Sequence, residues 1–187
     1  MKKINLLFVL ILAAFQLSAQ VKVGDATLPN TVNFNEETLT INGAGMREKF
    51  FFDIYAGGLY LKAKSKDPVK IAEADETMAI KLHIVSSMIS KDKLENALRE
   101  GFDKATNGKI AAISERIETF LGFMNEEIQV GQVYDIVYEK GKGSVVYKDG
   151  KEKGYVGGLD FKKALFNIWI GEKPADKGLK NELLSAF

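Results

Sequence analysis

Few residues in this chain could perform acid-base, nucleophilic or metal chemistry. His83 is the only histidine, and there is no cysteine. One imidazole without thiolates supplies too few ligands for a zinc site, and no acidic loop follows the spacing of a calcium site. We therefore expect no metal, no disulfide and no thiol catalysis. His83 falls on the polar side of an alternating segment, where we expect it to be solvated or hydrogen-bonded at the surface.

The glycine and serine patterns also lack a cofactor or catalytic signature. Gly43-Ala44-Gly45 has no third glycine and no following helix, both of which a dinucleotide-binding fingerprint requires. No serine sits in the strand-turn-helix pattern of a nucleophile elbow. We expect no cofactor.

The charge of the chain is nearly balanced, with 26 lysines and arginines against 25 aspartates and glutamates among 187 residues. The two signs are interspersed along the sequence. A nucleic acid, or an anionic membrane as the main partner, requires a clustered positive face. Neither is predicted as the main partner of this protein.

The N-terminus has the three-part layout of a secretory signal peptide. The basic start Met1-Lys2-Lys3 is followed by the apolar residues 4–15 and then by small residues that end at Ala19. The apolar stretch is shorter than the ~20 residues that cross a bilayer, so a retained anchor is the less favoured alternative. We expect a signal peptide at 1–19, cleavage after Ala19, and a periplasmic or secreted domain at 20–187 with no stable membrane insertion.

Apolar patterns predict mostly strands in this domain, which no repeat or linker divides. The predicted strands are 21–23, 38–41, 50–61, 77–85, 134–138, 144–147 and 153–156. Segment 50–61 is apolar on both sides, which predicts a central strand covered on both faces. Asp149-Gly150 predicts a tight hairpin between the last two strands.

Helical periodicity appears between and after these strands. The predicted helices are one capped by Ser90 that runs through Ala105, one over 110–124, one capped by Asp160 that runs through Trp169, and one over 177–187. Strands, paired helices, a strand meander and further helices indicate an α+β fold. One antiparallel sheet would then carry a layer of helices on one face.

Several segments, in order, resemble motifs of the chalcone isomerase family. Residues 39–47 and 50–61 resemble its glycine-arginine strand and its G-x-Y-L strand. Residues 90–96 resemble its helix Y-S-x-K-x-x-E-N, and residues 164–172 resemble its helix that ends in I-G-E. The resemblance spans nearly the whole mature chain. It implies an open-faced β-sandwich, in which helices cover a large antiparallel sheet.

The catalytic members of that family close a chalcone ring with an arginine, two threonines, a tyrosine and an asparagine. By this resemblance Arg47 and Asn96 match the arginine and the asparagine. Tyr55 and Ile168 stand at the two threonine positions, and Ile89 stands at the tyrosine position. Hydrocarbon side chains cannot hydrogen-bond a phenolate or its activating water, so the resemblance implies a non-catalytic protein.

Another branch of the family binds fatty acids through an arginine and a tyrosine, and Arg47 with Tyr55 resembles that pair. A guanidinium offers a carboxylate a planar fork of donors, a phenol adds one more, and Ile89 and Ile168 would line the acyl channel. We therefore expect an exported, non-catalytic carrier or buffer that binds a fatty acid or a similar amphipathic carboxylate.

The spacing of this pair sets a geometric condition. Eight residues of straight strand span about 26 Å. Arg47 and Tyr55 can share one carboxylate only if the chain turns between them, which we expect near Glu48-Lys49. Tyr60 is the alternative partner of Arg47.

Other interpretations stay open at this level. Arg47 could form an ion pair with Glu48, Tyr55 could be packed core, and Asn96 lies opposite the apolar face of its helix, which favours a solvated position. The protein could also be an isomerase or lyase acting on a phenolic enone with Arg47 as electrophile, or an interaction module whose cleft is filled by its own side chains.

Overall fold

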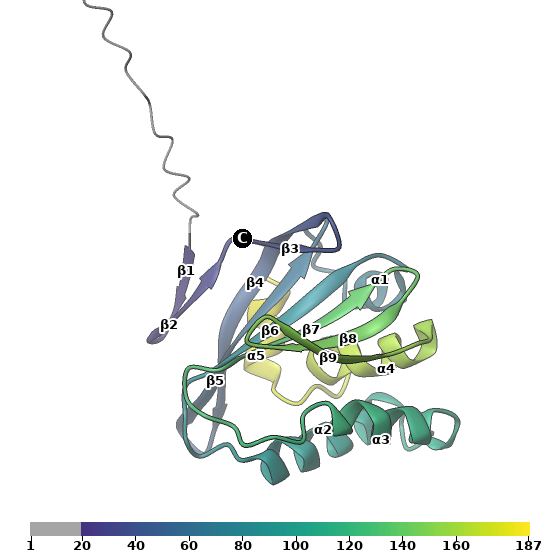
Figure 1. Cartoon of the computed structure of the whole chain (residues 1–187). Helices are drawn as coiled ribbons and strands as arrows, with labels where there is room; N and C mark the ends of the chain where they lie inside the picture. The colour runs from purple at the N-terminus through teal and green to yellow at the C-terminus, as the bar shows by residue number, and fades with distance from the viewer. Residues whose placement is uncertain (1–19) are drawn as a thin grey trace, which may run out of the picture.

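A seven-stranded antiparallel sheet forms the body of the structure, a computed structural model that describes residues 20–187 (Figure 1). The strand order is β3-β4-β5-β6-β7-β8-β9, so each strand pairs with its neighbours in sequence. The strands are β3 Thr31–Phe34, β4 Glu37–Lys49, β5 Phe52–Leu61, β6 Met78–Ile84, β7 Val133–Glu139, β8 Gly143–Lys148 and β9 Lys151–Val156. The predicted signal peptide, 1–19, lies outside the described residues.

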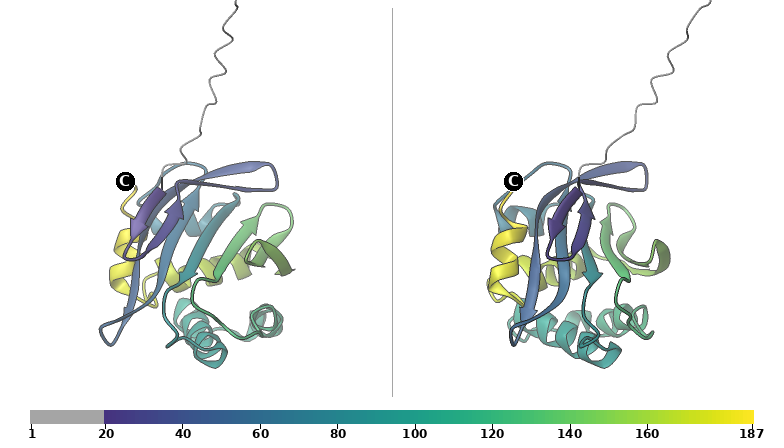
Figure 2. Two further views of the ribbon diagram at one scale, coloured as in Figure 1. Left: turned by 60° about the vertical axis from the view of Figure 1, so that its left-hand side comes forward. Right: turned by 90° about the vertical axis from the view of Figure 1, so that its left-hand side faces the viewer.

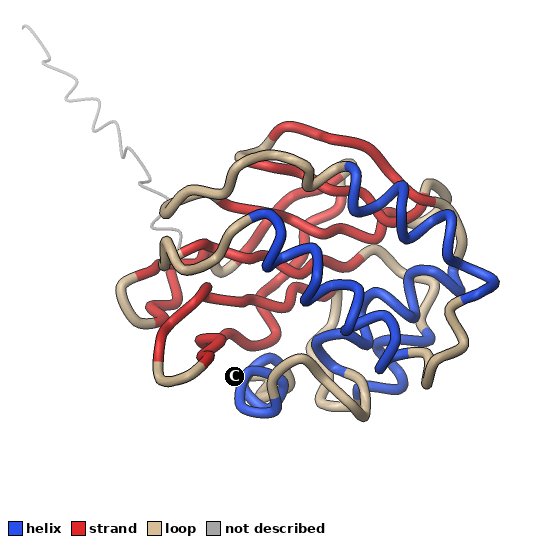
Figure 3. Tube along the Cα trace, turned by 90° about the horizontal axis from the view of Figure 1, so that it is seen from below, coloured by secondary structure: helices blue, strands red, loops and turns tan. Residues whose placement is uncertain are grey.

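Helices cover one face of this sheet, as Figures 1 and 3 show. They are α1 Pro68–Glu73, α2 Lys91–Ala105, η1 Ala111–Ile113, α3 Ser114–Gly122, α4 Leu159–Ile170 and α5 Lys177–Leu183. A separate hairpin of β1 Gln20–Val23 and β2 Ala26–Pro29 lies over β4 and β5 on the other face (Figure 2). The predicted α+β class and the helical layer are confirmed.

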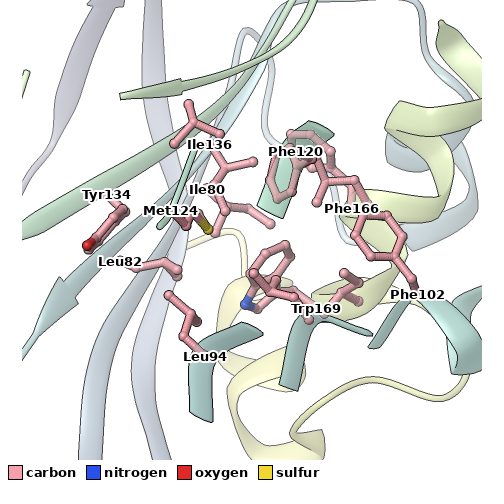
Figure 4. Close-up of a cluster of buried hydrophobic side chains, with 14 of the residues drawn as sticks. Ile80, Leu82, Leu94, Phe102, Phe120, Met124, Tyr134, Ile136, Phe166 and Trp169 are labelled. Carbon is pink, nitrogen blue, oxygen red and sulfur yellow. The ribbon is translucent and has the colours of Figure 1, made fainter. Parts of the chain in front are cut away.

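The larger of two hydrophobic cores lies between the sheet and the helices. Side chains of β6 and β7, such as Ile80 and Ile136, meet Phe102 of α2, Phe120 of α3 and Phe166 of α4 (Figure 4). The smaller core, under the β1–β2 hairpin, includes Leu28 and Tyr60. Both faces of β5 are therefore covered, as its two-sided apolar pattern predicts.

The glycines of β4 provide a seat for α5. Gly43, Gly45 and Arg47 alternate along the strand and so face the same side of the sheet. A Cβ atom on Gly43 would overlap the carbonyl oxygen of Glu182, and one on Gly45 would overlap the Glu182 side chain. The glycine pattern thus lets a helix approach the strand closely, and Arg47 is the first full-length side chain beyond this seat.

Two predicted strand and turn boundaries move. Segment 50–61 begins as a strand only at Phe52, because Phe50 and Phe51 form the turn between β4 and β5 with φ values of 53° and 67°. The turn therefore falls two positions beyond the predicted Glu48-Lys49. The predicted Asp149-Gly150 hairpin is confirmed between β8 and β9.

The helix boundaries follow the sequence signals less closely. Ser90 caps α2 as predicted, since its Oγ accepts a hydrogen bond from the Lys93 N–H at 3.3 Å. The predicted helix at 110–124 splits into a 3-10 turn, η1, and the shorter α3. Asp160 does not cap α4; Gly158, whose φ is 104°, stands there, and Asp160 lies in the first turn. The last helix ends at Leu183.

Candidate ligand-binding site

Arg47 and Tyr55 lie directly opposite each other across the β4–β5 hairpin. The guanidinium carbon of Arg47 is 5.5 Å from the centroid of the Tyr55 ring. Tyr55 is only 1 % exposed, while Arg47 is partly exposed. The hairpin meets the condition that the chain must turn between these residues. Beyond the Arg47–Tyr55 pair, only the pairs Glu48–Asp53 and Lys49–Phe52 precede the turn.

The phenol of Tyr55 is held from the helical layer. The indole Nε1–H of Trp169, on α4, donates a hydrogen bond of 2.9 Å to the Tyr55 hydroxyl oxygen. Both residues are buried. The Tyr55 hydroxyl keeps its own proton as a donor, and within residues 20–187 no side-chain or backbone acceptor takes it.

Arg47 differs from the two other arginines of the chain in its charge partners. Arg99 pairs with Glu95 at 2.8 Å, and Arg116 pairs with Asp160 at 2.6 Å. Within the described residues 20–187, Arg47 forms no ion pair and no side-chain hydrogen bond, so the alternative of an Arg47–Glu48 pair is not realised there. The guanidinium fork is thus available to an external carboxylate.

Two adjoining hollows share Arg47 in their walls. The larger is a cleft of about 400 Å³ lined by Arg47, Glu48, Lys49, Lys93, Asn96, Ala97, Glu100, Gly101, Lys104 and Ala175. The smaller is an apolar pocket of about 50 Å³ lined by Arg47, Lys49, Ile54, Met88, Ile89, Lys93, Leu94 and Ala97. Four cations face two carboxylates in the larger cleft, whereas the pocket lining contains three cations and no carboxylate. The site is therefore electropositive and turns apolar toward the core.

Comparison with known proteins places this architecture in a family. Residues 20–185 match the profile of proteins described as chalcone isomerase-like. The protein belongs to the chalcone isomerase-like family. The crystal structure of the Arabidopsis thaliana fatty-acid binding protein AtFAP1 is similar, with a TM-score of 0.73, 20% identity, and coverage of 89% of this chain and 96% of that chain. No curated protein matches the sequence.

These findings confirm the family resemblance and the open-faced sandwich that it implies. At 20% identity, the likeness to AtFAP1 shows the shared fold. The ordered motifs of this chalcone isomerase-like protein therefore correspond to real structural units, namely β4, β5, α2 and α4.

The other residues expected in the site of this chalcone isomerase-like protein are Ile89, Asn96 and Ile168, and they differ in how they relate to the two hollows. Ile89 is buried and lines the small pocket. Asn96 is exposed and lines the larger cleft from α2, which fits the solvated position that its helix face predicts. Ile168 lies behind Gly101, where a Cβ atom would come within 2.7 Å of its Cγ2 atom. Ile168 therefore supports the cleft from behind without lining it.

Tyr60 lies on the opposite face of the sheet from Arg47. Tyr60 follows Tyr55 by five positions on β5, and two strand residues an odd number of positions apart lie on opposite faces. The Tyr60 hydroxyl donates a hydrogen bond of 2.8 Å to the Pro29 carbonyl oxygen, and burial raises its pKa above the ordinary value. The structure thus separates the alternative partner from Arg47.

Trp169 is the site residue that the sequence did not single out. It stands next to Ile168 in the segment that resembles the family helix ending in I-G-E, and this was its only signal. Elsewhere, His83 is half-buried on β6. No cluster of three or more potential metal ligands occurs within residues 20–187, and no helix in that range is long and apolar enough to span a membrane.

Proposed function

We propose that this protein binds a fatty acid or a similar amphipathic carboxylate without catalysing a reaction, and that it serves as an exported lipid carrier or buffer. One observation carries the proposal. Arg47, the arginine without a carboxylate partner among residues 20–187, lies over the buried Tyr55 ring at the mouth of an apolar pocket. The unpaired guanidinium complements the carboxylate of a fatty acid, and the apolar pocket beside it complements the acyl chain.

The head group is bound at the junction of the two hollows. Arg47 presents two parallel N–H donors to the carboxylate, the bidentate geometry that makes such pairs strong. Lys49 and Lys93 line both hollows with Arg47 and add positive charge around the same point. Trp169 contributes indirectly, because its hydrogen bond fixes the ring under Arg47.

The acyl chain follows the inner face of α2. The pocket beside Arg47 leads to Ile54, Ile89 and Leu94, but its volume of about 50 Å³ is small next to the roughly 300–1,000 Å³ of typical ligand pockets. Binding of a long chain therefore requires α2 to move away from the sheet. Leu94, Leu98 and Phe102 hold α2 in place through apolar contacts that an acyl chain can replace with contacts of the same kind.

Two further lines support the proposal. The similar AtFAP1 is a fatty-acid binding protein, and it shares the fold over nearly its whole length. The export part rests on the signal-peptide pattern of residues 1–19. The carrier or buffer role follows from both, since a soluble exported protein with an acyl site keeps an insoluble ligand in solution.

The test compares a fatty acid with the corresponding fatty alcohol. Arg47→Ala should weaken binding of the acid at least ~tenfold, or ~1.4 kcal/mol, while the alcohol loses little because it carries no charge. Arg99→Ala is the matched control, since it removes an arginine whose carboxylate partners, Glu95 and Glu118, lie on the surface helices. Equal affinity of wild type and Arg47→Ala for the acid would refute the assignment of Arg47.

A second measurement tests the acyl channel independently of the head group. Organic extraction of protein purified from its native compartment, followed by mass spectrometry, should release an amphipathic acid. A cleft filled by its own side chains would release none, and this result would favour an interaction module.

A further inference from the structure

The tip of the β4–β5 hairpin projects beyond the rest of the sheet (Figure 2). The last residue pair between β5 and β6 is Tyr55 with Ile84, whereas β4 and β5 continue to pair through Glu48 with Asp53 and Lys49 with Phe52. The end of the β4–β5 hairpin thus extends past the last residue pair with β6. This projection carries the sequence Lys49-Phe50-Phe51-Phe52, which we call the phenylalanine tip.

The phenylalanine tip exposes three aromatic rings in succession. Phe50, Phe51 and Phe52 are 78%, 102% and 54% exposed. Isolated exposed apolar residues are common on soluble proteins, but a contiguous apolar patch indicates a binding surface. Three consecutive exposed phenylalanines at the end of this hairpin form such a patch.

The backbone of the phenylalanine tip argues that these aromatic residues serve a function. Phe50 and Phe51 adopt φ values of 53° and 67°, the two left-handed residues of a tight hairpin turn. Asn-Gly is the favoured pair for this turn, and a bulky residue in that conformation costs stability. Small residues at these two positions would make the turn more stable. We therefore infer that the aromatic rings are there to bind something outside the domain.

Cations and a further apolar side chain surround the base of the tip. Met88 is 41% exposed and shares the small pocket with Arg47, Lys49 and Lys93. The lining of that pocket contains no carboxylate, although Glu48 and Asp53 lie one pair back from the tip on the hairpin. The arrangement is an apolar point with positive charge beside it, which complements a layer of phosphate groups over hydrocarbon.

We propose that the phenylalanine tip docks on the surface of a phospholipid bilayer. The three rings enter the interface between head groups and acyl chains, and Lys49 and Lys93 contact lipid phosphates. Aromatic side chains with neighbouring basic residues bind at this depth without crossing the membrane. The attachment is shallow and reversible, and it is compatible with the near-neutral charge of the whole chain.

The shape of the surface favours a bilayer over a protein partner. A stable protein interface buries roughly 800 Å² on each side and involves about 20–30 residues of each partner. A convex tip of four residues offers far less. A bilayer has no fixed shape to match and accepts an isolated aromatic projection.

Docking at this point would bring a membrane to the proposed ligand site. Lys49 belongs both to the tip and to the lining of the two hollows that contain Arg47. If the proposed fatty-acid function holds, the acid can pass between the bilayer and Arg47 over a short path. The docking itself does not depend on that function.

The test is flotation of the full mature protein with vesicles. The vesicles contain either phosphatidylcholine alone or phosphatidylcholine mixed with phosphatidylglycerol. The variant Phe50→Asn/Phe51→Gly replaces the tip with the pair that suits its backbone, so it should fold at least as well as wild type. Val69→Ser is the matched control, because Val69 is 68% exposed on α1, which follows the opposite end of β5.

Wild type and Val69→Ser should bind the mixed vesicles, and the tip variant should bind at least ~tenfold more weakly. Binding to phosphatidylcholine alone should be weaker and less sensitive to salt, since the choline balances the phosphate and the head group has no net charge. Equal binding by wild type and the tip variant, or no binding by either, would overturn the proposal. A tip variant that changes only the oligomeric state in solution would also overturn it, by showing a protein-protein surface instead. Fatty-acid affinity measured without vesicles should be unchanged in the tip variant, which separates this proposal from the function of Arg47.

Discussion

The indole N–H of Trp169 donates a 2.9 Å hydrogen bond to the hydroxyl oxygen of Tyr55, so a residue of α4 holds the ring over which Arg47 lies. The two residues are 114 positions apart in sequence. This contact joins the helical layer to the β4–β5 hairpin at the base of the candidate site. The position of the Tyr55 ring under Arg47 therefore depends on how α4 packs against the sheet.

Tyr55→Phe should lower the free energy of unfolding by about 1–3 kcal/mol, because it leaves the buried indole N–H without an acceptor. Trp169→Phe should also destabilise, since it removes the same bond along with part of the packing. The double variant should lose less unfolding free energy than the sum of the two single losses, because both substitutions remove the same hydrogen bond. Chemical denaturation of the four proteins checks this, and strictly additive losses would mean that the bond contributes nothing.

Arg47→Lys should restore only part of the fatty-acid affinity that Arg47→Ala loses. An ammonium group keeps the charge but cannot present two parallel donors to a carboxylate. Titration of the three proteins with one acid should therefore rank wild type above Arg47→Lys and Arg47→Lys above Arg47→Ala. A lysine variant as strong as wild type would reduce the role of Arg47 to charge alone.

Turnover of a chalcone should be absent or barely above the uncatalysed rate. Two of the positions that carry hydroxyls in catalytic relatives hold Ile89 and Ile168, and both are buried among hydrocarbon. Proton transfer requires a polar group within hydrogen-bond distance of the reacting atom. Absorbance of the chalcone over time measures this, and a robust rate that vanished in Arg47→Ala would support the isomerase alternative.

The mature protein should begin at Gln20 and be found outside the cytoplasm. We expect the signal-peptide pattern of residues 1–19 to direct export and to be cleaved off after Ala19. Intact-mass measurement of the protein from its native host provides the check. A mass that includes residues 1–19 would favour a membrane-tethered form.

Lys162 should make stability depend on pH in the mildly alkaline range. Its buried ammonium donates hydrogen bonds to the carbonyl oxygens of Ile71, Ala72 and Ala74 at 2.8–2.9 Å. Burial, helped by the neighbouring charge of Lys163, lowers its pKa from 10.5 to about 8.

The sign of the effect follows from the lowered pKa of Lys162. Between about pH 8 and 10.5 the unfolded chain binds more protons at this site than the folded chain, so folding becomes more favourable as pH rises there. Lys162→Met lacks this contribution. The unfolding free energy of wild type minus that of Lys162→Met should therefore increase with pH across this window. A difference that does not change with pH would show an ordinary pKa for Lys162.

Local signals predicted most of the elements well. The two-residue alternation around Ile80 and Leu82 and the three-to-four-residue spacing of Leu94, Leu98 and Phe102 correspond to β6 and α2. Boundaries were less predictable. Phe50 and Phe51 read as strand residues because of their type, yet the pairing of β4 with β5 forces them into the turn.

The candidate site was predictable only in part. Arg47 and Tyr55 were named through the family resemblance, and the hairpin brings them together. Tyr60 was equally plausible by residue type, but the register of β5 turns it to the other face, where its hydroxyl reaches Pro29. Trp169 carried no distinguishing sequence signal, since a tryptophan in an apolar helix is usually ordinary core.

The sequence by itself determined the order of most strands and helices, though not β2, β3 or α1. It also determined the family motifs and the presence of an arginine after two glycines. These depend on side-chain periodicity and turn chemistry within a few residues, which act before the chain is folded. Only the tertiary structure decided what surrounds Arg47. The pairing of β4 with β5 sets Tyr55 under it, the packing of α4 brings Trp169 to Tyr55, and α5 occupies the glycine seat next to it. Such contacts join segments far apart in the chain, and the global packing of the domain selects them, so no local pattern encodes them.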